Sequence, residues 1–429
     1  MKPIFEEERQ FLGSFGIDIP KNCWKDGSKI YYAPYDTVPA YTLSVKDNNV
    51  LVKRDRTKFV TWTPIPLENI IEKEKERVLG LEKEAVDFLN SYIEKSYKET
   101  FSMAYSGGKD SDVLLSLCQK TSLNYMVHFC NTSNETAQTY LHVKKKLANM
   151  NHVFLNPSEG YYQWIKRKGF IPTRLVRNCC ATYKEGQISK YFSTKQPLFT
   201  ISGVRAYESA KRSAYKRVMD HDVWIEILGK SNQPKLWTTI APIVEWTDLD
   251  VWVYLLLYNI GFNAQYRYGF ERCGCLICPY QTDYTDLLIE HFYPIMWKRW
   301  KQTLADCYDS MYIEQNYKYT LEEWQNHKWK YGVSKEFEIT QKRPTEKSVK
   351  ELAELKGVPE EVAQGYFKRT CSECGKKLNP NEVGMNFKYF GTNAKNLICK
   401  KCFCKKNEMS AKEYNKQVTE FRDGGCKLF

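Results

Sequence analysis

Residues 105–111, Tyr-Ser-Gly-Gly-Lys-Asp-Ser, have the composition of a phosphate-binding loop. They follow a short apolar run at 101–104 and precede a helical apolar pattern from Val113, so we expect a strand, a turn and a helix. The glycines let the backbone approach an anion, and the helix N-terminus adds unpaired N–H donors. The alternative is a turn without a ligand. The predicted nucleotide-binding residues are Ser106, Gly107, Gly108, Lys109, Asp110 and Ser111.

Two Cys-x-x-Cys pairs near the C-terminus have the spacing of a zinc ribbon. The predicted zinc ligands are Cys371, Cys374, Cys399 and Cys402, with 24 residues between the pairs and Cys404 as a competing ligand. Residues 371–429 contain 12 Lys/Arg against 6 Asp/Glu, a net charge of +6. A basic zinc ribbon suits DNA or RNA, whereas a structural staple or a protein contact is the alternative.

Further blocks follow the glycine-rich loop, and together they resemble a known family. Two blocks contain cysteines: Arg-Asn-Cys-Cys-Ala-Thr-Tyr-Lys at 177–184 and Arg-Cys-Gly-Cys-Leu-Ile-Cys-Pro at 272–279. Two further blocks lie between them, at 203–212 and 242–252. In their order along the chain, these blocks resemble the phosphoadenosine phosphosulfate (PAPS) reductase family of the PP-loop ATP pyrophosphatase superfamily, over roughly residues 100–285. The cysteine pairs resemble its iron–sulfur branch, the adenosine phosphosulfate (APS) reductases.

The resemblance implies a [4Fe–4S] cluster held by Cys179, Cys180, Cys275 and Cys278. Four thiolates are the usual ligands of such a cluster, and adjacent cysteines do not easily form a relaxed disulfide. Zinc is the alternative occupant. Cys273 lies in the same block as Cys275 and Cys278, so the fourth ligand could be either Cys179 or Cys273.

Charged residues in these blocks are candidates for catalysis and phosphate binding. We expect Lys109 to neutralise phosphate and Asp110 to hold the loop or a Mg²⁺ ion. Arg205 and Arg212 are expected to bind phosphate or sulfate through bidentate hydrogen bonds. The family's catalytic cysteine in a Glu-Cys-Gly-x-His tail is absent, and the nearest substitute is Cys426, after two glycines that permit mobility. The predicted catalytic residues are Lys109, Asp110, Arg205 and Cys426.

Alternating strands and helices must position these residues. Strand-like runs recur at 103–105, 125–130, 153–155 and 198–202, with helical stretches between them. This pattern predicts an α/β fold with a doubly wound, mainly parallel sheet. Ligands bind beyond the carboxyl ends of such strands, so the loop at 105–111, residues 131–135 and residues 203–205 should converge there. His128, within a strand, is interpreted as a buried structural residue.

The chain is expected to contain three parts. Residues 1–67 form a β-rich module with a hairpin turn at 47–49, and its tyrosines pack the sheet or, alternatively, stack on bases. Residues 68–329 form the PP-loop catalytic domain, which a long helix at 67–99 introduces. Residues 330–429 contain the zinc ribbon and, at 348–363, a plain helical hairpin or a helix-turn-helix.

Composition narrows the class of protein. The chain has 429 residues, a formal net charge of +13 and 15 cysteines. An odd number of cysteines in metal-like spacings favours a reducing compartment, so we expect a cytoplasmic enzyme without a secretory signal or membrane partner. The positive charge favours a polyanionic partner or an anionic substrate.

Three functions follow, in this order. The first is reduction of adenylylated sulfate (APS or PAPS) to sulfite. The second is ATP-dependent sulfur transfer to DNA or RNA, as in the DNA phosphorothioation relatives of the family; the intact loop, the missing tail and the zinc ribbon favour it. The third is a non-catalytic nucleic-acid-binding protein, which the intact loop disfavours. The expected cofactors are a [4Fe–4S] cluster, ATP or another adenine nucleotide, Zn²⁺ and, as a further candidate, Mg²⁺, with a thiol as electron or sulfur donor.

Overall fold

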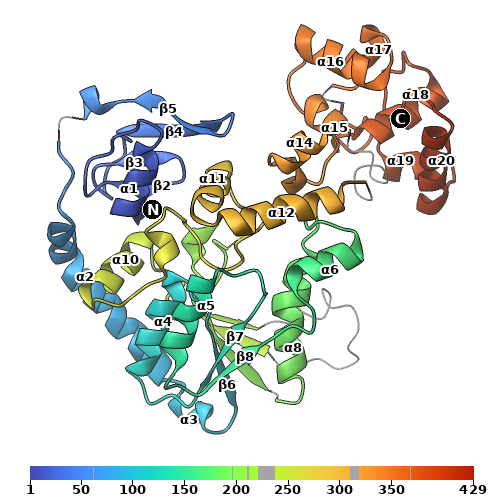
Figure 1. The fold of residues 1–429 in the computed structure, drawn as a ribbon. Coiled ribbons are helices and arrows are strands. Elements are labelled where there is room, and N and C mark those ends of the chain that lie inside the picture. Colours follow the sequence, from blue (N-terminus) through green and yellow to red (C-terminus); the bar gives the residue numbers. More distant parts are fainter. Residues whose placement is uncertain (61, 196, 210–211, 221–236, 310–317, 368) are drawn as a thin grey trace. The chain divides into compact units, whose positions relative to one another are not determined.

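The computed structural model divides the chain into two compact units (Figure 1). It describes all residues except 61, 196, 210–211, 221–236, 310–317 and 368. The first unit contains Met1–Lys168 and Pro172–Thr303, and the second contains Gly169–Ile171 and Leu304–Phe429. Within the described residues, no helix is both long and apolar enough to cross a bilayer.

The first unit begins with a five-stranded antiparallel sheet. Its strands, in spatial order, are β1 (Lys2–Pro3), β2 (Trp24–Asp26), β3 (Lys29–Tyr31), β4 (Tyr41–Lys46) and β5 (Asn49–Asp55). Asp47 and Asn48 connect β4 to β5 with positive φ angles of 49° and 56°, which a tight hairpin of this kind requires. The β-rich N-terminal module predicted from the sequence is therefore present.

The second sheet of this unit is mainly parallel, as predicted. Its strands, in spatial order, are β10 (Val218–Asp220), β11 (Trp237–Ile240), β9 (Leu198–Ile201), β6 (Thr100–Ala104), β7 (Met126–Cys130) and β8 (His152–Leu155). Among the strand pairs that the structure describes in this sheet, only β10–β11 is antiparallel. The chain moves outward from β6 in both directions, which is the doubly wound arrangement.

Helices cover both faces of the parallel sheet. The helices of this unit are α1 (Glu6–Gly13), α2 (Leu67–Asn90), α3 (Ile93–Ser96), α4 (Lys109–Gln119), α5 (Ala137–Leu147), α6 (Tyr161–Lys168), α7 (Asn178–Cys180), α8 (Gly186–Phe192), α10 (Asp248–Leu257), α11 (Asp283–Phe292) and most of α12 (Pro294–Asp306). Successive residues of a strand face opposite sides. On β7, His128 faces Phe192 of α8, whereas Phe129 faces Tyr140 of α5. His128 is buried and contacts Ser102, as expected of a structural residue.

The second unit is helical around its own core. Its helices are α14 (Leu321–Gln325), α15 (Lys335–Thr340), α16 (Glu346–Lys356), α17 (Glu360–Gln364), α18 (Pro380–Phe390), α19 (Lys400–Lys406) and α20 (Ala411–Asp423). Gly357 ends α16 in the left-handed conformation, with a φ of 64°, and the chain then turns back into α17. Residues 348–363 thus form a helical hairpin.

Candidate active site and cysteine clusters

The glycine-rich loop lies at the carboxyl end of β6 and leads directly into α4. Gly107 has a φ of +72°, and a Cβ atom there would lie 2.8 Å from Cγ2 of Val143, so only glycine fits. Gly108 caps α4, and the hydroxyl of Ser111 donates to its carbonyl at 2.8 Å. The backbone N–H of Lys109 donates to the hydroxyl of Tyr266 at 3.0 Å. The predicted strand, turn and helix are present, and nucleotide binding by the loop stays a prediction.

Two cations and two carboxylates meet beside this loop. Lys109 Nζ lies 2.9 Å from Asp110 Oδ2 and 3.4 Å from Asp248 Oδ1. Arg205 is only 1% exposed. Its Nε donates to Asp110 Oδ1 at 2.6 Å and its Nη2 to Asp248 Oδ1 at 2.7 Å. Its Nη1 donates to the carbonyl of Trp246 at 3.1 Å. Arg205 therefore orients the two carboxylates, and its direct contact with phosphate stays a prediction.

Asp248 follows β11 in the chain and carries a charge at neutral pH. Burial by itself raises the pKa of Asp248, but Lys109, the amino terminus and Arg205 together lower that pKa well below its usual value. Arg212, in contrast, is about one-third exposed and pairs with Glu208 in the segment after β9. Two neighbours within the same sequence block, residues 210–211, lie outside the described residues.

A second polar group lies behind the loop, and the sequence did not reveal it. Asp112 is buried; it accepts a hydrogen bond from the Tyr105 hydroxyl at 2.5 Å and lies 3.1 Å from Nε2 of His142. Its position on α4, two residues after Asp110, was a usable signal. His142 lies on α5 and has no motif around it, so only the fold could bring it here.

Cys273 packs against the core cluster that contains Tyr266, next to the loop. Burial raises the pKa of the Cys273 thiol, while a hydrogen bond with Tyr266 and the nearby Lys109 act in the opposite direction. Tyr266 thus contacts both the first residue of α4 and this thiol. This placement supports Cys179, rather than Cys273, as the fourth member of the first cysteine set.

The first cysteine set comprises Cys179, Cys180, Cys275 and Cys278 and joins two short segments. Cys179 and Cys180 form α7, and a π-helical turn at Ala181–Glu185 follows, a feature frequent at functional sites. Asn134 holds the other segment: its carbonyl accepts from the Leu276 N–H at 2.6 Å, and its Nδ2 donates to the Ile277 carbonyl at 2.8 Å.

The thiols of the first cysteine set are neighbours, but they do not form a compact group of four sulfurs. A hydrogen bond with Cys180, followed by burial and the nearby Cys275 and Cys278, raises the pKa of Cys179, so the four thiols are neighbours. Among the described residues, however, they are not a group whose sulfurs all lie within 4.8 Å of one another. Four thiolates around one zinc lie about 3.8 Å apart, since each Zn–S bond is about 2.3 Å long. In a [4Fe–4S] cluster each thiolate binds a different iron, so the sulfurs lie farther apart.

Tyr161 is a second sign that the first cysteine set holds a group. The phenol is 3% exposed, and its hydroxyl has no hydrogen-bond partner among the described residues. Burial, together with the nearby Cys179, Cys275 and Cys278, raises the pKa of Tyr161 well above its usual value. A buried hydroxyl without a partner is rare, and the sulfur atoms of a bound cluster would accept its hydrogen bond.

The second cysteine set comprises Cys371, Cys374, Cys399 and Cys402, and its sulfurs all lie within 4.8 Å of one another. Gly375, with a φ of +72°, donates to the Cys371 carbonyl at 2.9 Å and closes a tight turn between the first two cysteines. Burial raises the pKa of Cys371, but hydrogen bonds from backbone N–H groups outweigh it and lower this pKa to about 6. Cys404 points to the Ser410 carbonyl instead. The compact set has the spacing of a single-ion site.

Cys426 lies in a packed tail rather than a loose one. The Cys426 N–H donates to the Phe421 carbonyl at 2.9 Å, and the Cys426 carbonyl accepts a hydrogen bond from the Phe429 N–H at 3.0 Å. The Tyr366 hydroxyl donates to the Leu428 carbonyl at 3.0 Å, and Phe429 is 4% exposed. The tail around Cys426 was expected to be mobile. In the structure it packs instead, because Phe429 is part of the core of the second unit. Catalysis by Cys426 stays a prediction.

Comparisons with known proteins identify several that are similar to this chain. Residues 100–281 match the model of the phosphoadenosine phosphosulfate reductase domain. The uncharacterized protein MJ0973 of Methanocaldococcus jannaschii is 30% identical over 296 residues, 67% of this chain and 69% of its own. Adenosine 5'-phosphosulfate reductase 2 of Bacillus subtilis is 26% identical over 188 residues, 43% of this chain and 74% of its own. A crystal structure of PAPS reductase from Candida auris has a TM-score of 0.35 and 16% identity, covering 49% of this chain and 96% of that chain.

The matched region contains the loop, the carboxylate–arginine group and the first cysteine set. By its sequence matches, this chain is an enzyme that belongs to the PAPS reductase family of the PP-loop superfamily.

Proposed function

We propose that this enzyme cleaves ATP between the α and β phosphates at residues 105–111 and transfers sulfur to nucleic acid beside a [4Fe–4S] cluster. The observation that carries the proposal is that Cys273 packs against the core cluster containing Tyr266, whose hydroxyl accepts a hydrogen bond from the Lys109 N–H of the loop. Cys275 of the first cysteine set follows two residues later, and two residues span at most about 7 Å. The nucleotide loop and the cysteine set are therefore joined by one very short segment.

The loop residues would bind and orient the nucleotide. Backbone N–H groups at the start of α4 and the ammonium of Lys109 suit the phosphates. Asp110 and Asp248, which Arg205 holds together, offer carboxylate oxygens of the kind that Mg²⁺ prefers. An oxygen of the acceptor nucleotide attacks the α-phosphorus, and pyrophosphate leaves. Hydrosulfide then displaces AMP, so the oxygen departs with the phosphate. No electrons are gained or lost, because sulfide replaces oxygen at the same oxidation level.

The residues around the first cysteine set fit a cluster. Cys179, Cys180, Cys275 and Cys278 would hold it, and the cluster would supply a site for sulfide near the nucleotide. Tyr161 would donate a hydrogen bond to one of its sulfur atoms. The Thr132 hydroxyl, 3.4 Å from Cys275 Sγ, is placed for a similar contact. The second cysteine set would hold a structural zinc ion.

Two observations favour sulfur transfer over reduction of adenylylated sulfate, which the sequence had ranked first. The Glu-Cys-Gly-x-His tail of the family's reductases is absent from the sequence, and its nearest substitute, Cys426, lies in a packed segment. The region 371–429 is also basic, with a net charge of +6, which suits nucleic acid. Reduction remains the second candidate, because the Bacillus subtilis relative is an APS reductase.

One anaerobic assay separates these candidates. The purified enzyme is given ATP, APS or PAPS, each with sulfide and with or without single-stranded nucleic acid. We expect AMP and pyrophosphate from ATP only when nucleic acid is present, and no sulfite from APS or PAPS. Lys109→Ala should weaken nucleotide binding by on the order of 1.5–3 kcal/mol, since it removes a charge-assisted hydrogen bond. Sulfite release from APS or PAPS, with no AMP from ATP, would establish the reductase instead.

A further inference from the structure

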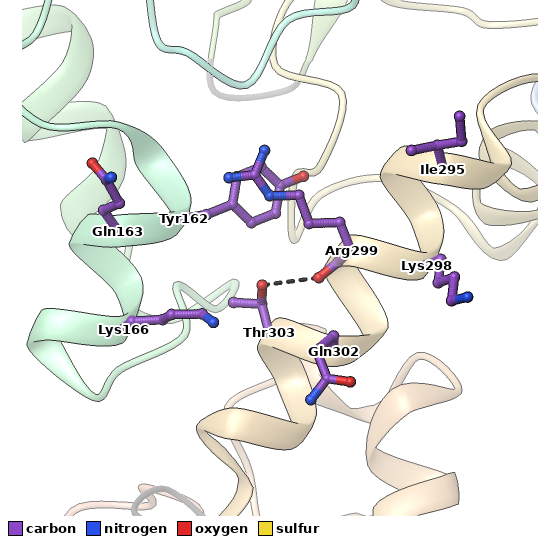
Figure 2. Close-up of a pocket in the computed structure, with 8 residues that line it drawn as sticks. All are labelled: Tyr162, Gln163, Lys166, Ile295, Lys298, Arg299, Gln302 and Thr303. Carbon is purple, nitrogen blue, oxygen red and sulfur yellow. Dashed lines mark hydrogen bonds between the residues drawn. The ribbon is translucent and has the colours of Figure 1, made fainter.

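A basic pocket lies between α6 and α12, outside the nucleotide loop (Figure 2). Its volume is about 460 Å³, within the usual range for small-ligand sites. The lining residues include three cations and no carboxylate. They are Tyr162, Gln163, Lys166, Ile295, Lys298, Arg299, Gln302 and Thr303. The pocket is therefore suited to an anionic ligand.

The floor of the pocket is a flat cation–aromatic pair. The guanidinium carbon of Arg299 lies 4.3 Å from the ring centroid of Tyr162. Tyr162 is 5% exposed, and its hydroxyl has no hydrogen-bond partner among the described residues. Figure 2 shows the two planar groups overlapping, with Lys166 of α6 on one side and Lys298 of α12 on the other. A planar surface with a positive charge at each side matches a nucleotide, whose base is flat and whose flanking phosphates are negative.

The pocket is also close to the first cysteine set along the chain. Tyr162 lines the pocket, while the preceding residue, Tyr161, lies beside Cys179, Cys275 and Cys278. The two rings contact each other, with centroids 5.7 Å apart. Two consecutive residues of α6 therefore face the pocket and the cysteine set, respectively. A ligand held in the pocket would be positioned near the sulfur chemistry proposed above.

We infer that this pocket binds one nucleotide of a single-stranded nucleic acid. The base stacks on the Arg299–Tyr162 pair, and Lys166 and Lys298 contact the phosphates on either side. The inference rests on the proposed function and specifies where its acceptor substrate lies. The carboxylates of an acidic protein segment would form ion pairs with the lysines, but they would not stack on the planar Arg299–Tyr162 pair.

Binding of a fluorescently labelled oligonucleotide, about 12 nucleotides long, tests this inference by anisotropy at several salt concentrations. Lys298→Ala should weaken binding and reduce the slope of log K against log salt by about 1, because one phosphate contact is lost. Arg299→Lys keeps the charge but loses the planar group, so affinity should fall about tenfold while the slope stays unchanged. Lys83→Ala, an exposed lysine on α2, is the matched control and should change neither quantity.

Two results would overturn the inference. One is wild-type affinity in Arg299→Lys. The other is displacement by polyglutamate as efficient as by unlabelled oligonucleotide, which would make the pocket a site for an acidic protein. The proposed function fails separately. If the variants bind weakly as expected but the wild type transfers no sulfur, the pocket stands and the proposed reaction does not. If sulfur transfer proceeds and the variants bind normally, the reaction stands and the pocket does not.

Discussion

Replacing Arg205 tests whether this residue organises the site or binds phosphate. In Arg205→Gln the carboxylates of Asp110 and Asp248 lose the guanidinium that joins them, and the Trp246 carbonyl loses a donor. Breaking a buried ion pair by removing one partner costs about 3–5 kcal/mol. Lys109 still contacts both carboxylates, so we expect the lower end, about 3 kcal/mol.

Thermal unfolding of the variant measures this loss. For a unit of about 300 residues, about 3 kcal/mol corresponds to a decrease in Tm of roughly 5 °C. Arg205→Lys should lie between Arg205→Gln and the wild type, because one ammonium cannot reach both carboxylates and the carbonyl. The control is Arg212→Gln, which removes a partly exposed pair with Glu208 on a short segment after β9 and should change stability by less than about 1 kcal/mol. If Arg205→Gln unfolds at the wild-type temperature and loses only nucleotide affinity, Arg205 binds phosphate and the organising role is refuted.

Three further predictions concern the loop, the N-terminal module and pH. Gly107→Ala should lower nucleotide affinity at least tenfold, because its Cβ would meet Val143 in a conformation that alanine avoids; Gly16→Ala, with a φ of +74° and open space around it, should leave affinity unchanged in the same titration. Glu8→Gln should destabilise the first unit by about 3 kcal/mol in thermal melts, since Glu8 is the buried partner of two buried lysines, and wild-type stability would contradict this. Burial lowers the pKa of His128 from 6.5 to about 4, so stability should be complete above pH 6.5 and fall by up to about 3 kcal/mol as the pH drops to 4. His128→Gln should remove that part of the acid sensitivity in melts at pH 7 and pH 4.5, and equal acid sensitivity in the variant would show that His128 is not its source.

The fold and the loop could be predicted because their signals are local. The spacing of Gly107, Gly108 and Lys109 between a strand and a helix specifies a backbone conformation, and alternating strands and helices specify the sheet. The expected convergence at the carboxyl edge also follows from topology alone, and Gly203 at the end of β9 indeed approaches the backbone of Asp110, since a Cβ there would lie 3.1 Å from the Asp110 carbonyl oxygen.

The partners of the charged residues could not be predicted, because they depend on tertiary contacts. Arg205 contacts Asp110 and Asp248, which lie 95 and 43 residues away in sequence, so its enclosure between two carboxylates has no local signal. In the sequence, Cys273 is spaced from Cys275 and Cys278 as a metal ligand would be. Its packing beside Tyr266, which contacts the loop, is visible only in the fold. Two glycines before Cys426 suggested mobility, whereas the burial of Phe429 fixes the tail.

Analysis of the nucleic acid recovered after reaction tests the central proposal most directly. The anaerobically purified enzyme, brown and containing about four irons per chain if the cluster is present, is incubated with ATP, sulfide and single-stranded nucleic acid. The nucleic acid is then digested and examined by mass spectrometry. We predict sulfur in place of oxygen in the recovered nucleotides, dependent on ATP and lost in Lys109→Ala. Nucleotides without sulfur, from an enzyme that contains its iron and binds ATP, would contradict the proposed sulfur transfer.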